Sequence, residues 1–226
     1  MAQTLNAPPV GRAGAHPARP APRATRLLLA GALAAGPLFL GAGVAQGLAR
    51  DGFDFTRHAI SQLALGDPGW IQTANFLITG ALLVAGSIGL RRTLSGGGVG
   101  RTWGPVLIGV FGASFLAAAA FPADAGAGFP AGAPGAAVLS AHGAVHMVGG
   151  MVGYLALCAA FLVLARTLAA RGHRGWSVAC RLVPFGVLAG FVGSSATVLA
   201  FTVGAGLGLV WLAAVTARLL ADAADR

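Results

Sequence analysis

Residues 182–217 read LVPFGVLAGFVGSSATVLAFTVGAGLGLVWLAAVTA, a stretch without a charged residue. One helix over this stretch would be nearly twice as long as the roughly 30 Å hydrocarbon core of a bilayer. Two spans joined by a tight turn near Thr202–Gly206 are therefore expected, since Gly204 and Gly206 permit such a turn. Working outward, similar apolar runs give six predicted spans: 27–48, 70–90, 103–121, 138–165, 182–201 and 205–221.

The composition agrees with a chain embedded in a lipid bilayer. Of the 226 residues, 56% are hydrophobic and 9% are charged, and the mean hydropathy is +0.78. Soluble domains carry roughly 25% charged residues, so this chain lacks the polar surface of a cytosolic enzyme or a disordered protein. Two cysteines are too few for a disulfide scaffold. The fold class expected is an all-α membrane protein built as a six-helix bundle.

The net charge of +9 comes from arginines that lie between the apolar runs, since the chain has no lysine. Thirteen arginines fall on one side of the predicted spans, whereas only Arg50 and Arg57 fall on the other. The positive-inside rule then places both termini in the cytoplasm. It accounts for the basic charge by membrane orientation, so no nucleic-acid partner is expected. Abundant Ala, Gly and Arg without Lys are typical of a GC-rich bacterial genome. We expect a multi-pass protein of the bacterial cytoplasmic (inner) membrane.

The predicted organisation is a disordered basic cytoplasmic tail over residues 1–25, a transmembrane domain over 26–221 and a cytoplasmic tail over 222–226. Small residues recur one helical turn apart in Gly149-xxx-Gly153, Gly186-xxx-Gly190 and Gly204-xxx-Gly208. Such pairs let helices approach closely, and we expect packing inside one bundle rather than dimerisation.

The fourth predicted span opens with Ser140-Ala-His142-Gly-Ala-Val-His146. Residues four apart share one helix face, so His142 and His146 point the same way. This pair could ligate a divalent metal such as zinc, with further ligands from elsewhere. The alternatives are hydrogen-bonding or substrate-contacting histidines without a metal, or haem ligands. An ionisable residue within a span is a functional-site hypothesis in its own right.

Asp124, in Phe121-Pro122-Ala-Asp124, is the only charge in the third loop and lies on the same side as these histidines. It could ligate the metal, act as a general base or orient an imidazole. The alternative is ordinary turn chemistry after a proline.

The first outer loop, residues 51–70, predicts a short interfacial helix over 55–65, capped by Asp54 and ended by Gly66 and Pro68. Its apolar residues would be Ile60, Leu63 and Ala64, with His58, Ser61 and Gln62 on an adjoining face. This helix could cover a cavity near His142 and His146, or it could be an amphipathic connector only.

These segments resemble an uncharacterised bacterial family of integral membrane proteins, the domain of unknown function 998. The resemblance runs from about Leu27 to Leu220. It is carried by DFTRHAISQL at 54–63, by Gly69-Trp70, Asn75-Phe76 and Gly80, by Phe121-Pro122-Ala-Asp124, and by His142-Gly143 with His146. The resemblance implies a six-helix membrane protein and supplies no reaction.

The candidate catalytic residues are His58, Ser61 and Asp124, and the candidate metal ligands are His142, His146 and Asp124. A metal on the histidines would activate water in a hydrolase or transferase that acts on lipid. Titrating histidines would instead serve a small-solute or proton-coupled transporter. A third hypothesis is a non-catalytic assembly subunit whose outer end binds another protein. The sequence leaves open whether the protein is an enzyme, and it predicts the bilayer as partner with a small molecule or lipid as ligand.

Overall fold

The computed structural model describes residues 22–94, 99–136 and 138–224. It contains six α-helices: α1 (Arg23–Ala49), α2 (Trp70–Thr93), α3 (Val99–Ala120), α4 (Ala141–Ala170), α5 (Arg174–Gly193) and α6 (Val198–Ala224). A short 3₁₀ helix, η1 (Ile60–Ala64), lies between α1 and α2. The all-α prediction is confirmed for these residues.

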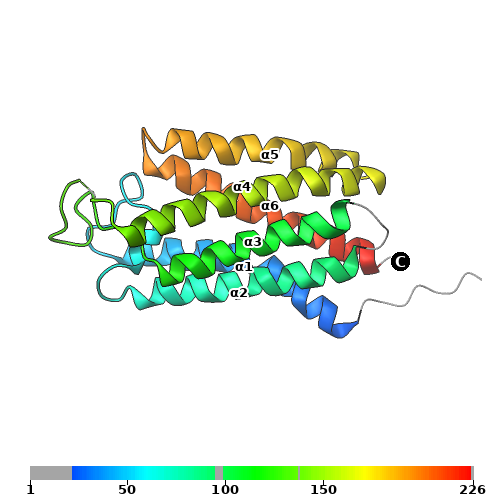
Figure 1. Cartoon of the computed structure of the whole chain (residues 1–226), viewed down its shortest axis with the longest axis horizontal. Coiled ribbons are helices and arrows are strands. Elements are labelled where there is room, and N and C mark those ends of the chain that lie inside the picture. The colour runs from blue at the N-terminus through cyan, green and yellow to red at the C-terminus, as the bar shows by residue number, and fades with distance from the viewer. Residues whose placement is uncertain (1–21, 95–98, 137, 225–226) are drawn as a thin grey trace, which may run out of the picture.

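All six helices are long and apolar enough to cross a membrane. Each packs against its neighbours in the chain, and α6 returns to pack against α1, which closes the bundle (Figure 1). Phe39 of α1, Phe76 of α2 and Phe115 of α3 meet in the core, where their ring centroids lie 4.9–5.9 Å apart. Helices satisfy most of their backbone polar groups internally, as hydrocarbon surroundings require, although Pro37, Pro105 and Pro184 each remove one donor.

The two ends of the bundle differ. One end, here called the long-loop end, carries the loop from α1 to α2, the loop from α3 to α4 and the turn from α5 to α6 (Figure 1). The other, here called the arginine end, carries the start of α1, the end of α6 and the remaining two links. The arginines described at or near the arginine end are Arg23, Arg26, Arg91, Arg92, Arg101, Arg166, Arg171, Arg174, Arg181 and Arg218.

The predicted turn near Thr202–Gly206 is wrong. The turn between α5 and α6 lies at residues 194–197, and α5 begins at Arg174 rather than near residue 182. Gly204 is instead a packing residue of α6, because a Cβ added there would lie 2.8 Å from the Cα of Gly190 in α5. Two facing glycines let these helix backbones touch.

The other small-residue pairs also face neighbouring helices. A Cβ at Gly153 would overlap Ser114 of α3, and one at Gly208 would meet Leu157 of α4 at 3.0 Å. A Cβ at Gly186 would meet Leu207 of α6 at 2.7 Å. The expectation of packing within the bundle is confirmed at these positions.

Several predicted boundaries also change. The predicted tail at 1–25 lies outside the described residues up to position 21, and α1 already begins at Arg23. At the other end, α6 continues to Ala224, so Asp222 is helical, and the predicted cytoplasmic tail over 222–226 stays a prediction. The helix expected over 55–65 is only the 3₁₀ segment Ile60–Ala64, because Ala59 is extended (φ −75°, ψ 147°). Gly66, with φ +61°, follows that segment as expected of a helix stop.

Candidate functional site

Asp124 holds the start of α4. Its carboxylate accepts hydrogen bonds from the backbone N–H of Ser140 (3.0 Å) and from the Ser140 hydroxyl (2.5 Å). The same Ser140 oxygen accepts from the N–H of Gly143 (3.0 Å), which makes Ser140 the N-cap of the helix. A negative charge at a helix N-terminus is stabilising, and the hydrogen bonds from Ser140 hold the pKa of Asp124 below its usual range.

Gly143 is required by this contact. A Cβ at position 143 would overlap the Asp124 carboxylate. The pattern of Asp124 followed by Ser140 and Gly143 is therefore accounted for by one helix-capping unit. The carboxylate is already engaged, and its hydrogen-bond partner is Ser140 rather than an imidazole.

Phe121 connects the two histidines of α4. Helix α3 ends at Ala120, and Pro122 follows Phe121, so the carbonyl of Phe121 receives no donor from a continuing helix. This carbonyl lies 2.9 Å from Nδ1 of His146, while the ring of Phe121 meets the ring of His142 edge-on at 5.5 Å. The two imidazoles therefore share one helix face, as expected, but His146 is half-buried and His142 is exposed.

His58 fastens the first loop to the third. Its side chain is 2% exposed, its Nδ1 accepts from the N–H of Asp54 (2.9 Å), and its Nε2 lies 3.1 Å from the carbonyl of Ala127. Since Nδ1 accepts, Nε2 carries the proton and donates to Ala127. Both ring nitrogens are thus used by the backbone, which leaves neither free for a substrate or a metal.

Further contacts tighten the same pair of loops. Arg57 donates to the carbonyl of Ala127 (3.0 Å), and Gln62 donates to the carbonyl of Asp124 (3.3 Å). Asp54 stabilises the turn before η1, since its carboxylate accepts from the hydroxyl (2.7 Å) and the N–H (2.8 Å) of Thr56. These bonds lower the pKa of Asp54. The loops form one cap over the bundle.

Beneath this cap lies a cavity of about 90 Å³, lined by η1 and by every α-helix except α5. Its wall is mostly apolar and carries no aspartate, glutamate, lysine or arginine. The polar lining residues are Ser61, Ser114, His146, Tyr154 and Thr202. Of the residues predicted from sequence, Ser61 and His146 therefore share this cavity, whereas His58, Asp124 and His142 are not among the lining residues.

Most of these polar groups lack a protein partner. The hydroxyl of Thr202 is buried without a hydrogen bond, and no bond within the described chain engages the hydroxyls of Ser61 and Tyr154. Tyr154 is only 8% exposed. Ser114 differs, because its hydroxyl donates to the carbonyl of Phe111 (2.7 Å). Since buried polar groups in proteins are nearly always satisfied, the hydroxyl of Thr202 needs a hydrogen-bond partner from outside the chain, and the hydroxyls of Ser61 and Tyr154 are free to bind one.

The donor set does not fit a metal centre. Among the residues that the structure describes, no group of three or more His, Cys, Asp or Glu side chains is arranged to hold a metal ion. Asp124 is engaged by Ser140, and Nδ1 of His146 is engaged by Phe121. The predicted metal ligands His142, His146 and Asp124 stay a prediction that this geometry does not favour.

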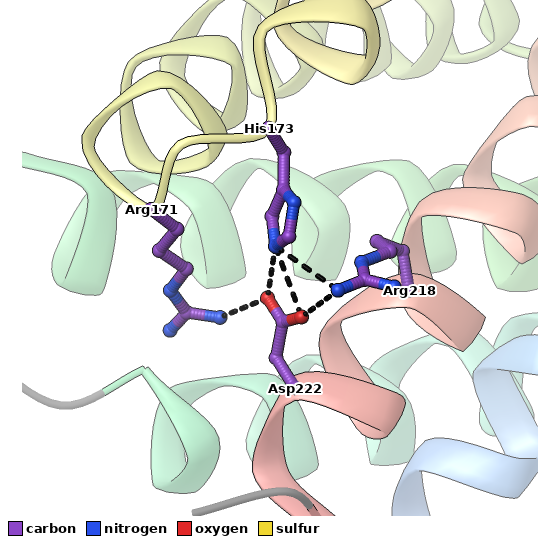
Figure 2. A network of polar contacts seen from close by, with 4 residues as sticks. All are labelled: Arg171, His173, Arg218 and Asp222. Carbon is purple, nitrogen blue, oxygen red and sulfur yellow. Dashed lines mark hydrogen bonds and ion pairs between the residues drawn. The ribbon is translucent and has the colours of Figure 1, made fainter.

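Sequence reasoning missed a second polar cluster at the arginine end. Asp222 of α6 lies among Arg171, His173 and Arg218 (Figure 2). Its carboxylate is 2.6 Å from Arg218, 3.0 Å from Nε2 of His173 and 3.4 Å from Arg171. The cluster fastens the link between α4 and α5 to the end of α6. The i, i+4 spacing of Arg218 and Asp222 was the one signal in the sequence that could have found part of it.

A buried amide cluster between α1 and α2 was also missed. Gln72 accepts from Gln46 (2.9 Å) and from Asn75 (3.2 Å), and Asn75 also donates to the carbonyl of Phe39 (3.1 Å). These bonds pin the two helices together where Phe39 lines the cavity.

One family model, described as "Protein of unknown function (DUF998)", matches residues 33–218. No curated protein and no solved structure matches the chain.

Proposed function

The chain belongs to the DUF998 family of proteins of unknown function, and within that family we propose that it binds an amphipathic, lipid-like molecule in the cavity of the long-loop end. The observation that carries this proposal is the set of unpartnered polar groups on one apolar cavity. Tyr154 and Thr202, whose hydroxyls have no protein partner, line the same cavity as His146. A ligand with a polar head would satisfy them, and its hydrocarbon would contact the apolar wall.

The volume of the cavity limits the size of the ligand that it can hold. In another protein, an apolar cavity of roughly 150 Å³ admits benzene. A cavity of about 90 Å³ therefore accommodates the head and first carbons of an amphiphile rather than a whole lipid. The phenylalanines Phe39, Phe76 and Phe115 form the apolar side.

This proposal gives the sequence-predicted residues distinct roles. His146 and Ser61 contact the ligand, whereas Asp124 and His58 hold the walls by capping α4 and fastening the loops. The Asp124 carboxylate, which a metal-assisted lipid hydrolase would need as a ligand, is hydrogen-bonded to Ser140 instead.

Filling the cavity tests the proposal. A Cβ added at Gly150, which lines the cavity, meets no atom within 4 Å, so Gly150→Leu should fold and occupy the space. Gly41→Leu is the matched control, since Gly41 of α1 is exposed, is not among the lining residues and is equally unobstructed.

Native mass spectrometry of the proteins purified in mild detergent provides the readout. The wild type and Gly41→Leu should retain a bound amphiphile, and Gly150→Leu should lose it while its circular dichroism spectrum stays that of the folded protein. Equal retention by a folded Gly150→Leu protein would contradict the proposal.

We also propose that the arginine end faces the cytoplasm of a bacterial inner membrane, which places η1 and the cavity at the outer face. The support is the concentration of arginine at one end together with both described termini (Figure 1). A membrane-impermeant maleimide should label Asp51→Cys in intact cells, and should label Arg92→Cys only after permeabilisation. The reverse labelling pattern would show that the arginine end faces outward.

A further inference from the structure

The tautomer of His146 is fixed by a backbone carbonyl. Nδ1 lies 2.9 Å from the oxygen of Phe121. A carbonyl oxygen only accepts hydrogen bonds, so Nδ1 must carry the proton and donate. The Phe121-Pro122 sequence ends α3 at this point and leaves the carbonyl available.

The surroundings of His146 favour the neutral ring. Within the described chain no carboxylate forms an ion pair with His146, and both oxygens of the nearby Asp124 are bonded to Ser140. The ring is half-buried and meets Phe76 edge-on at 6.1 Å. An unpaired cation among such groups is costly. With Nδ1 protonated and the ring neutral, Nε2 carries a lone pair and acts only as an acceptor.

The remaining polar groups of the cavity are hydroxyls, which can donate or accept. Tyr154 and Thr202 can therefore hydrogen-bond to a ligand oxygen of any kind, but Nε2 of His146 can form a hydrogen bond only with a donor. An ether, ester or ketone offers acceptors alone and would cover Nε2 without giving it a hydrogen bond. A ligand hydroxyl can donate to Nε2 and accept from Tyr154 or Thr202 at the same time.

We propose that the ligand is an uncharged lipid alcohol whose hydroxyl donates to Nε2 of His146 while its first carbons lie against Phe39, Phe76 and Phe115. This inference rests on the proposed function and names the ligand class of the same cavity. The absence of charged side chains from the lining residues agrees with an uncharged head. Charged heads such as carboxylates and phosphates would enter without a counter-charge.

The test compares two isomeric probes, 1-octanol and methyl heptyl ether, by nitrogen NMR of ¹⁵N-histidine-labelled full-length protein in detergent micelles. The His146 signals are assigned with His146→Gln. Before probe is added, Nδ1 should be protonated and Nε2 unprotonated. Octanol should move the Nε2 resonance upfield, because its hydroxyl donates to the lone pair. Octanol should also bind about tenfold more tightly than the ether, because the ether covers an acceptor without giving it a hydrogen bond.

Gly150→Leu separates cavity binding from changes in the micelle. In that variant octanol should leave the His146 resonances unmoved, whereas Gly41→Leu should respond like the wild type. A protonated Nε2 before probe addition, equal binding of both isomers, or an unchanged octanol response in Gly150→Leu would overturn the inference.

The outcomes also separate the two proposals. If Gly150→Leu loses the retained amphiphile but the isomers bind equally, a lipid-like ligand is supported and the alcohol class is overturned. If Gly150→Leu retains the amphiphile, the proposed function and this inference fail together.

Discussion

The two ends of the bundle use polar residues in opposite ways. At the arginine end, the carboxylate of Asp222 contacts three basic side chains, although Nε of Arg218 is buried without a hydrogen bond (Figure 2). At the long-loop end, the cavity is uncharged, and the hydroxyls of Tyr154 and Thr202 have no partner among the described residues. Polar groups that pair across elements, as Asp222 does, hold the fold together, whereas unpaired hydroxyls that share one cavity are available to a ligand.

Removing Asp222 should give the largest effect. Asp222→Ala leaves Arg171, His173 and Arg218 facing one another, and we expect a loss of about 2–3 kcal/mol in the free energy of unfolding. This loss in the free energy of unfolding is smaller than for a fully buried ion pair, because Arg218 is 31% exposed. Unfolding of both proteins by SDS titration measures this change in free energy. Arg171→Gln removes the longest of these contacts and should cost less than about 1 kcal/mol. An unchanged free energy of unfolding in Asp222→Ala would show that the cluster does not fasten the link to α6.

The next effect concerns the loops over the cavity. His58→Ala removes two hydrogen bonds to backbone groups, and we expect a loss of about 2 kcal/mol with faster proteolysis of the first loop. His142→Ala is the matched control, because that ring is exposed and should be dispensable for stability. Equal protease resistance of both variants would show that His58 does not fasten the loops.

A smaller effect of opposite sign is expected in the cavity. Thr202→Val removes a buried hydroxyl without a partner, so the ligand-free protein should gain up to about 1 kcal/mol while its ligand binding weakens. Thr216→Val on the same helix removes a hydroxyl that donates to the carbonyl of Leu212 (2.8 Å) and should destabilise the protein. A loss of stability in both variants would mean that Thr202 has a partner in the protein.

The smallest effect is a loss of stability in acid. The folded-state pKa values of Asp124 and Asp54 are lowered, chiefly by hydrogen bonds from Ser140 and Thr56. Their stabilisation is therefore present above the usual carboxyl pKa of roughly 4 and is lost as the pH falls through the folded values. Unfolding temperatures measured between about pH 5 and pH 2 should fall, and Asp124→Asn should flatten part of that fall. An identical slope in the variant would exclude Asp124 as a contributor.

Hydropathy and the arginine pattern predicted the helical class because spans need about 20 apolar residues whatever their neighbours are. They misplaced the turn between α5 and α6. The arginine pattern predicts a loop that includes Arg174 and Arg181, although α5 begins at Arg174. Gly204 is predicted to form a turn, although it packs against Gly190. Glycine alone does not distinguish a turn from a close helix contact, which depends on the facing helix.

The site was only partly predictable for a similar reason. The spacing of His142 and His146 identified the right helix face, but which ring reaches the cavity depends on the end of α3 at Phe121. Tyr154 and Thr202 lie within apolar runs and carry no spacing signal, so their convergence required the packed bundle. His173 and Asp222 likewise meet only in the fold.

A high-resolution electron cryomicroscopy map of the protein purified in mild detergent tests the central claim most directly. The account predicts elongated density in the cavity, with its polar end within hydrogen-bond distance of Nε2 of His146 and of the Thr202 hydroxyl. A cavity without such density, in which Tyr154 and Thr202 bond to the protein itself, would contradict it.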